Sequence, residues 1–395
     1  MNQEKVFVSG DEAVALGARL ARPHVVAAYP ITPQTIVVER ISEMAEDGSF
    51  PTEFMHVESE HSAISAVMGA SSVGARTFTA TSSQGLAYMA EGLHYASGGR
   101  YPIVMMNANR SLALPWSIFG DLRDSLSLLD SGWIQVYVED AQEALDMTIQ
   151  AYKIAEHQKV LTPFMVNLDG FILTHTYEEI HIPEQKQVDE FLPPFKTPNK
   201  MSPEEPKNLG FSTSPADNME FKYQQHKAMM DSFEVIEQTD KEFGDLFGRY
   251  YGGMLETYKT EDAEAILITV GSVSGTTRIV VDKMREEGKK VGFIKLRYLR
   301  PFPREKLTKA LENAHSLGVL DKDISFGYEG TIFTNVRSAI SNMNHLDTVN
   351  YVGGMGGRDI SKADIEFMFD DLLHNTVETR KEDVKFINMG VNIDE

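Results

Sequence analysis

Four short polar segments among the first 110 residues carry the side chains best suited to chemistry. Each directly follows an apolar run that predicts a β-strand. The segments are Tyr29-Pro30-Ile31-Thr32-Pro33-Gln34-Thr35, Val57-Glu58-Ser59-Glu60-His61, Thr79-Ala80-Thr81-Ser82-Ser83-Gln84-Gly85 and Asn107-Ala108-Asn109-Arg110. Open parallel sheets bind their ligands at the carboxyl ends of the strands. The sequence therefore predicts a ligand site built from these segments.

Glu60 is the candidate for proton chemistry. It follows a predicted strand at 53–57 and opens a predicted helix at 60–74 whose early residues are mostly small or apolar. In an apolar cleft the pKa of a carboxyl group rises, so that it can share a proton with a ligand nitrogen. A carboxylate at a helix N-terminus also commonly stabilises the helix, by about 0.3–1 kcal/mol. Both interpretations stay open at the level of the sequence.

Thr32 and Arg110 are the candidates for binding an anion. Pro30 and Pro33 bracket Thr32 and stiffen its loop, so a ligand can dock against the hydroxyl with little loss of entropy. A guanidinium such as that of Arg110 can hold a carboxylate through two parallel hydrogen bonds. The structural alternatives are a helix cap in the first loop, with Thr35 as the cap, and a salt bridge for Arg110.

Ser83 lies in a turn, residues 81–85, that offers hydroxyls and backbone amides just before a predicted helix. Such a turn suits an anion or the polar edge of a cofactor. An ordinary helix start is the alternative interpretation.

Alternating strands and helices must position these segments. Strands are predicted at 24–28, 53–57, 76–81, 101–106, 134–138 and 162–168, with helices at 11–21, 36–44, 60–74, 85–96 and 141–156. Prolines between residues 183 and 215 then interrupt both the strand and the helix periodicity of apolar residues. A long polar helix is predicted at 221–251. A second alternation follows, with strands at 265–270, 291–295, 317–320 and 348–352 and helices at 276–286, 304–311, 333–343 and 363–373. This pattern predicts two α/β domains with mostly parallel, doubly wound sheets.

Composition excludes several classes of function. The 395 residues include 37 Lys and Arg against 58 Asp and Glu, a net charge of −21 that disfavours nucleic acid and anionic membranes. With zero cysteines the chain can form no disulfide and can supply no cysteine ligand to a cluster. Neither a secretory signal nor a membrane span is evident, which favours a cytoplasmic protein. P-loop and metalloprotease motifs are absent, no metal ligands are predicted, and the glycine-rich stretch 353–357 lacks dinucleotide spacing.

In order along the chain, a set of motifs resembles the alpha subunit of the 2-oxoacid:ferredoxin oxidoreductases, the pyruvate:ferredoxin oxidoreductase or pyruvate synthase family. Besides the segments 29–35 and 58–63, the matching stretches are Gly74-Ala75-Arg76, Asn109-Arg110, Asp130-Ser131-Gly132-Trp133-Ile134-Gln135, Met165-Val166-Asn167-Leu168-Asp169-Gly170-Phe171, Arg300-Pro301-Phe302-Pro303, Ser325-Phe326-Gly327 and Gly356-Gly357-Arg358-Asp359-Ile360. The ordered set is more specific than any one motif.

The resemblance implies a subunit of a thiamine diphosphate enzyme that oxidatively decarboxylates a 2-oxoacid with coenzyme A. Glu60 would hydrogen-bond N1′ of the cofactor's aminopyrimidine and act as the catalytic residue, and Pro30, Ile31 and Ser83 would also contact the cofactor. The substrate-binding residues would be Thr32, Arg110 and Phe119. Because the chain has neither cysteine nor a Gly-Asp-Gly motif, Mg²⁺ and the iron–sulfur clusters would lie on partners. Those implied are a beta subunit, a gamma subunit, a ferredoxin-like delta subunit and ferredoxin or another electron acceptor.

The resemblance also implies a domain order. A thiamine pyrimidine-binding domain would span 1–180, an arm and long helix 181–258, a transketolase C-terminal-like domain 259–375 and a tail 376–395.

The loop after Arg110 departs from the pyruvate-type pattern. It carries Trp116, Ile118 and Phe119, which would favour a branched or aromatic 2-oxoacid by about 1–3 kcal/mol if they face the substrate. Packing against a partner subunit is the alternative. Two other classes remain open: a non-catalytic scaffold that keeps the fold, and an enzyme that works without partners.

Overall fold

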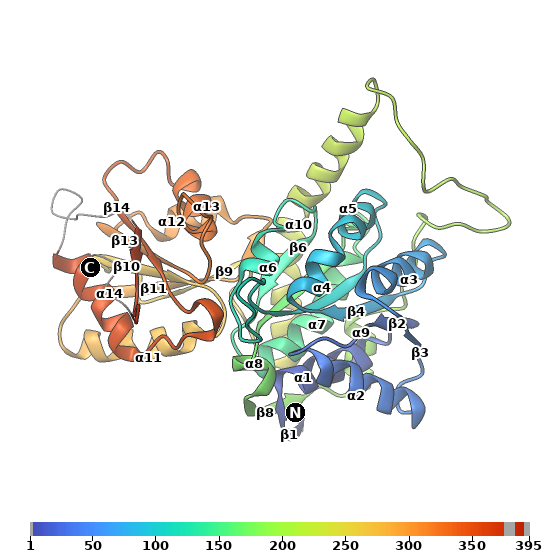
Figure 1. The fold of residues 1–395 in the computed structure, drawn as a ribbon, viewed down its shortest axis with the longest axis horizontal. Coiled ribbons are helices and arrows are strands. Elements are labelled where there is room, and N and C mark those ends of the chain that lie inside the picture. The colour runs from blue at the N-terminus through green and yellow to red at the C-terminus, as the bar shows by residue number, and fades with distance from the viewer. Residues whose placement is uncertain (1–2, 375–383, 391–395) are drawn as a thin grey trace.

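Seven strands form the larger of two sheets, in the order β12-β6-β7-β5-β4-β2-β3 (Figure 1). The computed structural model describes residues 3–374 and 384–390. The strands are β2 (Val25–Ala28), β3 (Glu53–His56), β4 (Thr77–Thr81), β5 (Val104–Asn109), β6 (Ile134–Tyr137), β7 (Phe164–Asp169) and β12 (Tyr298–Arg300). All neighbours run parallel except β12 and β6. Parallel strands need crossover connections, and helices supply them here.

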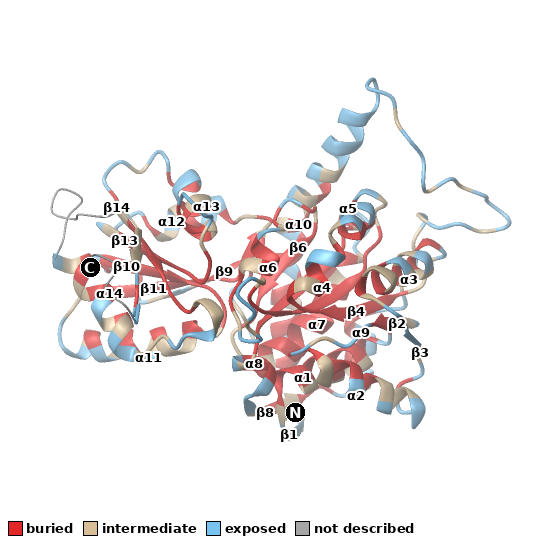
Figure 2. Cartoon of the chain, in the orientation of Figure 1, coloured by how far each residue is buried: buried red, intermediate tan, exposed pale blue. Residues whose placement is uncertain are grey.

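Helices cover both faces of this sheet. They are α1 (Gly10–Ala21), α2 (Thr35–Glu46), α3 (Glu60–Ser72), α4 (Ser83–Tyr88), α5 (Ala90–Gly98), α6 (Arg123–Leu126), α7 (Ala141–Ala155) and α8 (Ile172–His175). Side chains of β5 alternate between the faces: Val104 and Met106 pack in a core with α1 and α7, whereas Met105 packs in a second core with α3 and α5. The central strands are therefore buried along their whole length (Figure 2).

The second sheet has six strands in the order β15-β14-β13-β10-β11-β9. Its strands are β9 (Leu255–Tyr258), β10 (Ala265–Thr269), β11 (Val291–Leu296), β13 (Ser316–Asp321), β14 (Asp347–Val352) and β15 (Val384–Phe386). Its helices are α11 (Val273–Glu286), α12 (Arg304–Ala310), α13 (Thr331–Ala339) and α14 (Lys362–His374), with a 3-10 turn η1 (Met355–Gly357). Among the described strands of this second sheet, only β9 runs antiparallel to its neighbour. Two largely parallel, helix-covered sheets confirm the predicted α/β class.

The pairings of β1 (Glu4–Ser9), β9, β12 and β15 were not predicted. The strand β1 forms an antiparallel ribbon with β8 (Tyr177–Ile182), and β12 leaves the second half of the chain to extend the first sheet. The described part of the predicted tail 376–395 holds β15, an edge strand of the second sheet. Each of these strands pairs with a segment far away in the sequence or is very short, so no local period reveals it. The predicted domain boundaries stay a prediction.

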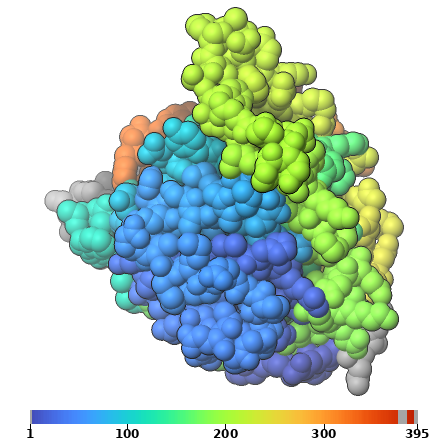
Figure 3. Space-filling model, turned by 90° about the vertical axis from the view of Figure 1, so that its right-hand side faces the viewer, coloured from blue at the N-terminus to red at the C-terminus, as the bar shows by residue number. Residues whose placement is uncertain are grey.

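The proline-containing arm contains one short helix, α9 (Gln185–Phe191), where the sequence predicted none. The buried Val188 and Phe191 account for it, since both pack in the first core. Beyond α9 the chain runs without helix or strand across the N-terminal part of the molecule, as Figure 3 shows, with Met201 N donating to Ser72 O at 2.8 Å. The predicted long helix is α10 (Asn218–Phe247), which buries Val235, Ile236 and Phe243 against the first domain's core.

Buried ion pairs join the two sheets. Lys295 of β11 lies 2.7 Å from Glu143 of α7 and 2.8 Å from Glu139, and Arg297 Nε lies 2.7 Å from Glu143. The side chains of Lys295, Arg297 and Glu143 are at most 3% exposed. No helix within residues 3–374 and 384–390 has the length and apolar character that a membrane crossing requires.

Candidate active site

The predicted segments meet at one edge of the first sheet. Strands β5, β4, β2 and β3 are consecutive in that sheet, so the loops at their carboxyl ends lie side by side. The four loops are those that begin after Ala28, His56, Thr81 and Asn109. The structure thus brings together residues that are up to 80 positions apart in sequence.

Glu60 is buried, and its carboxylate accepts no hydrogen bond from the residues that the structure describes. Ser59 supplies the side-chain cap of α3, through a 3.2 Å bond from Ser62 N to its Oγ. Glu60 lies in the first turn of the helix, so the predicted alternative of a charge interaction with the helix N-terminus stays open. The carboxylate lies against Gly85, where an added Cβ would come within 2.7 Å of Glu60 Oε1. The same added Cβ would come within 2.5 Å of Thr81 Oγ1. Glycine at position 85 therefore leaves room for the Glu60 carboxylate.

Arg110 reaches back to the loop after β2. Its Nη1 donates to Thr32 O at 2.7 Å, and its Nη2 donates to Gln84 Oε1 at 3.3 Å. Its Nε is buried without a partner, and the side chain forms no ion pair with any described residue, so the predicted alternative of a salt bridge is wrong. Burial lowers the pKa of the guanidinium, and the charge of Asp124 acts in the opposite direction.

The loop at 29–35 does not cap the following helix with a threonine. Helix α2 begins at Thr35, and the residue before it, Gln34, makes no side-chain cap bond. Thr32 and Pro30 are exposed, whereas Ile31 is half-buried. The cap interpretation of Thr35 is therefore wrong, and Thr32 contacts Arg110 through its carbonyl oxygen.

Gln34 is a residue of this edge for which the sequence suggested no role. It is fully buried, and its Nε2 donates to Tyr29 O at 2.9 Å and to Ala80 O at 3.1 Å, which ties the loop after β2 to β4. Its Oε1 is buried without a partner, as are polar atoms of Thr79, Thr81 and Ser82. Unpaired buried polar atoms are costly, so their concentration here fits a site that completes its bonds with a ligand.

Ser83 is the first residue of α4 and is fully buried. Its backbone has φ of 51°, a left-handed conformation that serine seldom adopts. Its Oγ lies 2.7 Å from Ser111 O and its N–H donates to Asp124 Oδ2 at 3.0 Å. The cofactor contact predicted for Ser83 stays a prediction, and these contacts show the residue holding the turn in place.

Asp124 is a second residue that the sequence did not single out. It lies in α6, is 1% exposed and accepts hydrogen bonds from backbone N–H groups of Ser83, Arg110 and Ser125. Asn109 Nδ2 donates to it as well, at 2.8 Å. Burial raises the pKa of the Asp124 carboxyl to about 6, against the lowering effect of these donors. Its main partners lie 14 and 41 positions away, so no sequence spacing could have indicated it.

Phe119 lies where the loop after Arg110 meets the second sheet. Its ring packs 4.9 Å from the ring of Phe171. Gly357 lies so close to Phe119 that a Cβ added to the glycine would clash with the Cβ of Phe119. The glycine-rich stretch at 353–357 holds this loop, because Gly357 N donates to Gly120 O at 2.7 Å and Gly356 N to Asp121 Oδ2 at 3.2 Å. In this structure two amides of the stretch thus hold the loop. The substrate contact of Phe119 stays a prediction.

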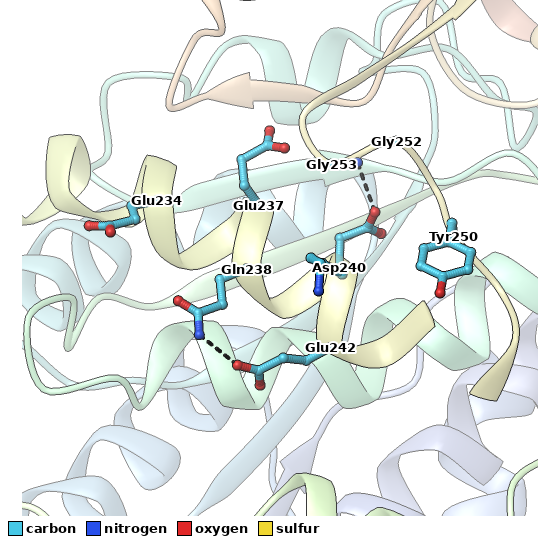
Figure 4. A pocket seen from close by; sticks show the side chains of 9 residues that line it. Glu234, Glu237, Gln238, Asp240, Glu242, Tyr250, Gly252 and Gly253 are labelled. Carbon is cyan, nitrogen blue, oxygen red and sulfur yellow. Dashed lines mark hydrogen bonds between the residues drawn. The ribbon is translucent and has the colours of Figure 1, made fainter. Parts of the chain in front are cut away.

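An acidic hollow beside the end of α10 lies apart from the strand-end edge (Figure 4). Three of its lining carboxylates have partners. Asp240 accepts a bond from Gly253 N at 2.9 Å, Glu237 accepts one from Met254 N at 3.1 Å, and Glu242 pairs with Lys153 at 2.5 Å. Asp240 and Glu237 thus hold the segment 250–254 against α10, and Glu242 holds α10 against α7.

Comparisons with known proteins show the family of the chain. The profile of the family "Pyruvate flavodoxin/ferredoxin oxidoreductase, thiamine diP-bdg" matches residues 16–241, and that of "Pyruvate:ferredoxin oxidoreductase core domain II" matches residues 263–365. The chain is 48% identical over 359 residues to pyruvate synthase subunit PorA of Methanothermobacter thermautotrophicus, covering 91% of this chain and 93% of that protein. It is 46% identical over 373 residues to ketoisovalerate oxidoreductase subunit VorA of Pyrococcus horikoshii, covering 94% of each.

Among solved structures, 2-oxoglutarate:ferredoxin oxidoreductase from Magnetococcus marinus, with 2-oxoglutarate, coenzyme A and succinyl-CoA bound, has a TM-score of 0.72 and 21% identity. The match covers 94% of this chain and 66% of that chain, slightly less than two thirds of its length. A split gene transketolase matches with a TM-score of 0.52 and 13% identity over 93% of this chain and 98% of its own. At these identities the two likenesses bear on the fold.

Proposed function

The chain belongs to the 2-oxoacid:ferredoxin oxidoreductase family as an alpha subunit, and from this premise we propose that it supplies the proton-handling and substrate-binding side chains of a thiamine diphosphate site. The reaction would convert a 2-oxoacid and coenzyme A to acyl-CoA and CO₂. Two electrons would pass to ferredoxin through iron–sulfur clusters on partner subunits. The observation that carries the proposal is the carboxylate of the largely buried Glu60, which lies beside Gly85 and accepts no hydrogen bond from the described residues.

Glu60 fits the requirement for an aminopyrimidine ring. When bound, thiamine diphosphate supplies the carbon nucleophile and the electron sink for decarboxylation. A ring nitrogen of the aminopyrimidine needs a partner that can give and take a proton, and Glu60 is a carboxyl group with both oxygens free among the described residues. Buried hydroxyl groups without partners on Thr81 and Ser82 lie in the adjoining turn. Glu60 would hold a proton at N1′ and thereby set the protonation state of the ring.

Arg110 and Thr32 fit a substrate carboxylate. A guanidinium has five N–H donors, and the hydrogen bonds to Thr32 O and Gln84 Oε1 use two of them. The remaining donors of this buried cation suit an anion that approaches the edge of the sheet. Arg110 and Glu60 contact the same turn, through Gln84 and Gly85, so a substrate held by Arg110 would lie near a ring held by Glu60.

Partner subunits would complete the site. The sequence contains neither cysteine for a cluster nor Gly-Asp-Gly for the diphosphate and Mg²⁺. A beta subunit would supply the diphosphate and Mg²⁺ site and a cluster, and gamma and ferredoxin-like delta subunits would bind coenzyme A or pass electrons onward. The subunit names of the two similar proteins support such an assembly.

Pyruvate is our first candidate for the substrate, and a branched 2-oxoacid such as 2-oxoisovalerate is the second. Pyruvate synthase and ketoisovalerate oxidoreductase subunits are almost equally similar to this chain, at 48% and 46% identity. The aromatic pair of Phe119 and Phe171 favours the larger substrate if it borders the substrate.

Replacing Glu60 tests the proposal. We expect Glu60→Gln to abolish 2-oxoacid-dependent dye reduction by the complex assembled with its partner subunits, since the amide cannot exchange a proton with the ring nitrogen. The matched control is Glu58→Gln, because Glu58 is exposed and accepts a hydrogen bond from Ser62 Oγ at 2.7 Å. Full activity of Glu58→Gln is expected. Substantial turnover by Glu60→Gln would refute the role of Glu60 and favour a scaffold subunit.

A further inference from the structure

Asp124 is a buried carboxylate at the centre of the strand-end edge. Its Oδ2 accepts from Ser83 N at 3.0 Å, Arg110 N at 3.1 Å and Asn107 Nδ2 at 3.3 Å. Its Oδ1 accepts from Asn109 Nδ2 and Ser125 N, each at 2.8 Å. The residue is 1% exposed, and five donors and no salt bridge surround it within the described chain. A side chain that accepts five hydrogen bonds through its two oxygens must be a carboxylate, because an amide has only one acceptor oxygen.

The donors come from two different strand ends. Ser83 starts the turn after β4, and Arg110 directly follows β5. One carboxylate oxygen therefore holds the backbone of the turn beside Glu60 and the backbone of the substrate-binding arginine at the same point. We propose that Asp124 is a positioning residue for this site, which sets the place of the Arg110 guanidinium relative to Glu60.

This proposal rests on the proposed function and deepens it. The guanidinium of Arg110 has its own anchors in Thr32 O and Gln84 Oε1, and Gln84 follows Ser83 in the chain. Displacing Ser83 would therefore move an anchor of the guanidinium as well as the turn that carries Gly85. The left-handed backbone of Ser83, with φ of 51°, persists only where neighbouring contacts hold it, and the bond from its backbone N–H to Asp124 is one of them.

A purely structural role is the competing account, since loss of any buried carboxylate destabilises a fold. The two accounts differ in what happens to substrate binding in molecules that do fold. If Asp124 positions Arg110, its loss weakens binding of the 2-oxoacid carboxylate more than it slows turnover. If it only stabilises the fold, the surviving complex binds substrate normally.

The test uses the assembled complex and whichever of pyruvate, 2-oxoisovalerate and phenylglyoxylate the wild type turns over fastest. In Asp124→Asn the amide presents an NH₂ group to donors, so we expect KM to rise tenfold or more, with kcat changed less than threefold. The half-saturating concentration of thiamine diphosphate is expected to stay within threefold. A KM within twofold of wild type would overturn the proposal, even with a lowered melting temperature.

Asp146→Asn is the matched control. Asp146 is fully buried, and it accepts hydrogen bonds from Arg249 and Tyr251, neither of which contacts Glu60 or Arg110, so its loss should lower the melting temperature and leave KM unchanged. If Asp124→Asn fails to assemble, Asn109→Ala tests the proposal in its place. This variant removes one hydrogen-bond donor to Asp124 and keeps the Asp124 carboxylate. A KM increase of about threefold or more is expected there, and an unchanged KM overturns the proposal. Failure of the proposed function would instead appear as turnover by Glu60→Gln.

Discussion

Glu60 and Glu58 are two acidic side chains close in sequence that differ in their hydrogen bonding. Glu58 is exposed and bonded to Ser62 Oγ, whereas Glu60 is buried and its carboxylate has no hydrogen-bond partner among the described residues. The polar atoms that are buried without a partner lie beside it, on Gln34, Thr81 and Ser82. At the scale of single residues, this arrangement supports the proposal that Glu60 meets a ligand.

The space beside Glu60 depends on Gly85. A Cβ at this position would lie 2.7 Å from Glu60 Oε1 and 2.5 Å from Thr81 Oγ1, so the Gly85→Ala variant must displace the carboxylate. We expect it to lower the 2-oxoacid-dependent activity of the complex tenfold or more, with a melting temperature within a few degrees of wild type, since alanine favours a helix. Activity assays and thermal melts measure both.

Gly98→Ala is the control for this variant, because no atom lies within 4 Å of the added Cβ and the residue is also helical. Its activity should match that of wild type. Normal activity of Gly85→Ala would show that the position of the Glu60 carboxylate does not limit the reaction.

At the scale of elements, the loop between β5 and α6 is held at both of its ends. Asp124 fixes the N–H of Arg110 at its start, and the turn η1 of the second domain bonds Gly120 and Asp121 near its end. Its middle is left open to solvent, with Leu114 79% and Trp116 69% exposed. Large apolar side chains that are this exposed commonly mark a contact with another protein. The structure thus favours the partner-packing alternative for Trp116.

Trp116→Ala tests this interpretation. We expect the variant to lower the fraction of subunit that assembles with the beta partner, because an exposed tryptophan is a frequent source of interface affinity. The ratio of kcat/KM values for 2-oxoisovalerate and pyruvate should stay unchanged in the complex that forms. Gel filtration and steady-state kinetics measure the two quantities. Normal assembly with a shifted substrate ratio would instead place Trp116 at the substrate.

At the scale of the whole molecule, buried charges join the two α/β halves. Lys295 and Arg297 of the second half pair with Glu143 of α7. Burial by itself raises the pKa of Glu143, but the charges of Lys295 and Arg297 outweigh it and lower the pKa to about 2. Asp169 adds a second link, since its carboxylate accepts bonds from Ser272 N at 2.7 Å and Lys322 Nζ at 2.9 Å.

The low pKa of Glu143 predicts a pH dependence of stability. An unfolded glutamate titrates near pH 4.3, so the stabilisation is complete above that pH and is lost as the pH falls toward 2. A shift of this size corresponds to roughly 3 kcal/mol. Glu143→Gln removes the carboxylate shared by two buried cations, of which Lys295 keeps Glu139 at 2.8 Å and Arg297 keeps Asp240 at 3.8 Å. Its free energy of unfolding should be lower by about 3 kcal/mol at pH 7.

The difference between wild type and Glu143→Gln should narrow as the pH falls below about 4.3, because wild type then loses the same interaction. Urea unfolding curves at pH 7, 5 and 3.5 measure this. A difference that stays constant over that range would show that Glu143 does not titrate as its ion pairs require.

The sequence alone determined the α/β class, most helices and strands, and the segments that form the site. These rest on local patterns: apolar periods, and polar residues directly after strands. The tertiary structure decided between some of the alternatives that the sequence left open. Ser59 provides the side-chain cap of α3, while Arg110 contacts Thr32 O and pairs with no acidic side chain of the described residues. It also revealed Asp124, whose main partners are backbone N–H groups 14 and 41 positions away. Every residue but proline has such a group, so side-chain identity carries no sign of these bonds, and only the packing of the strands creates them.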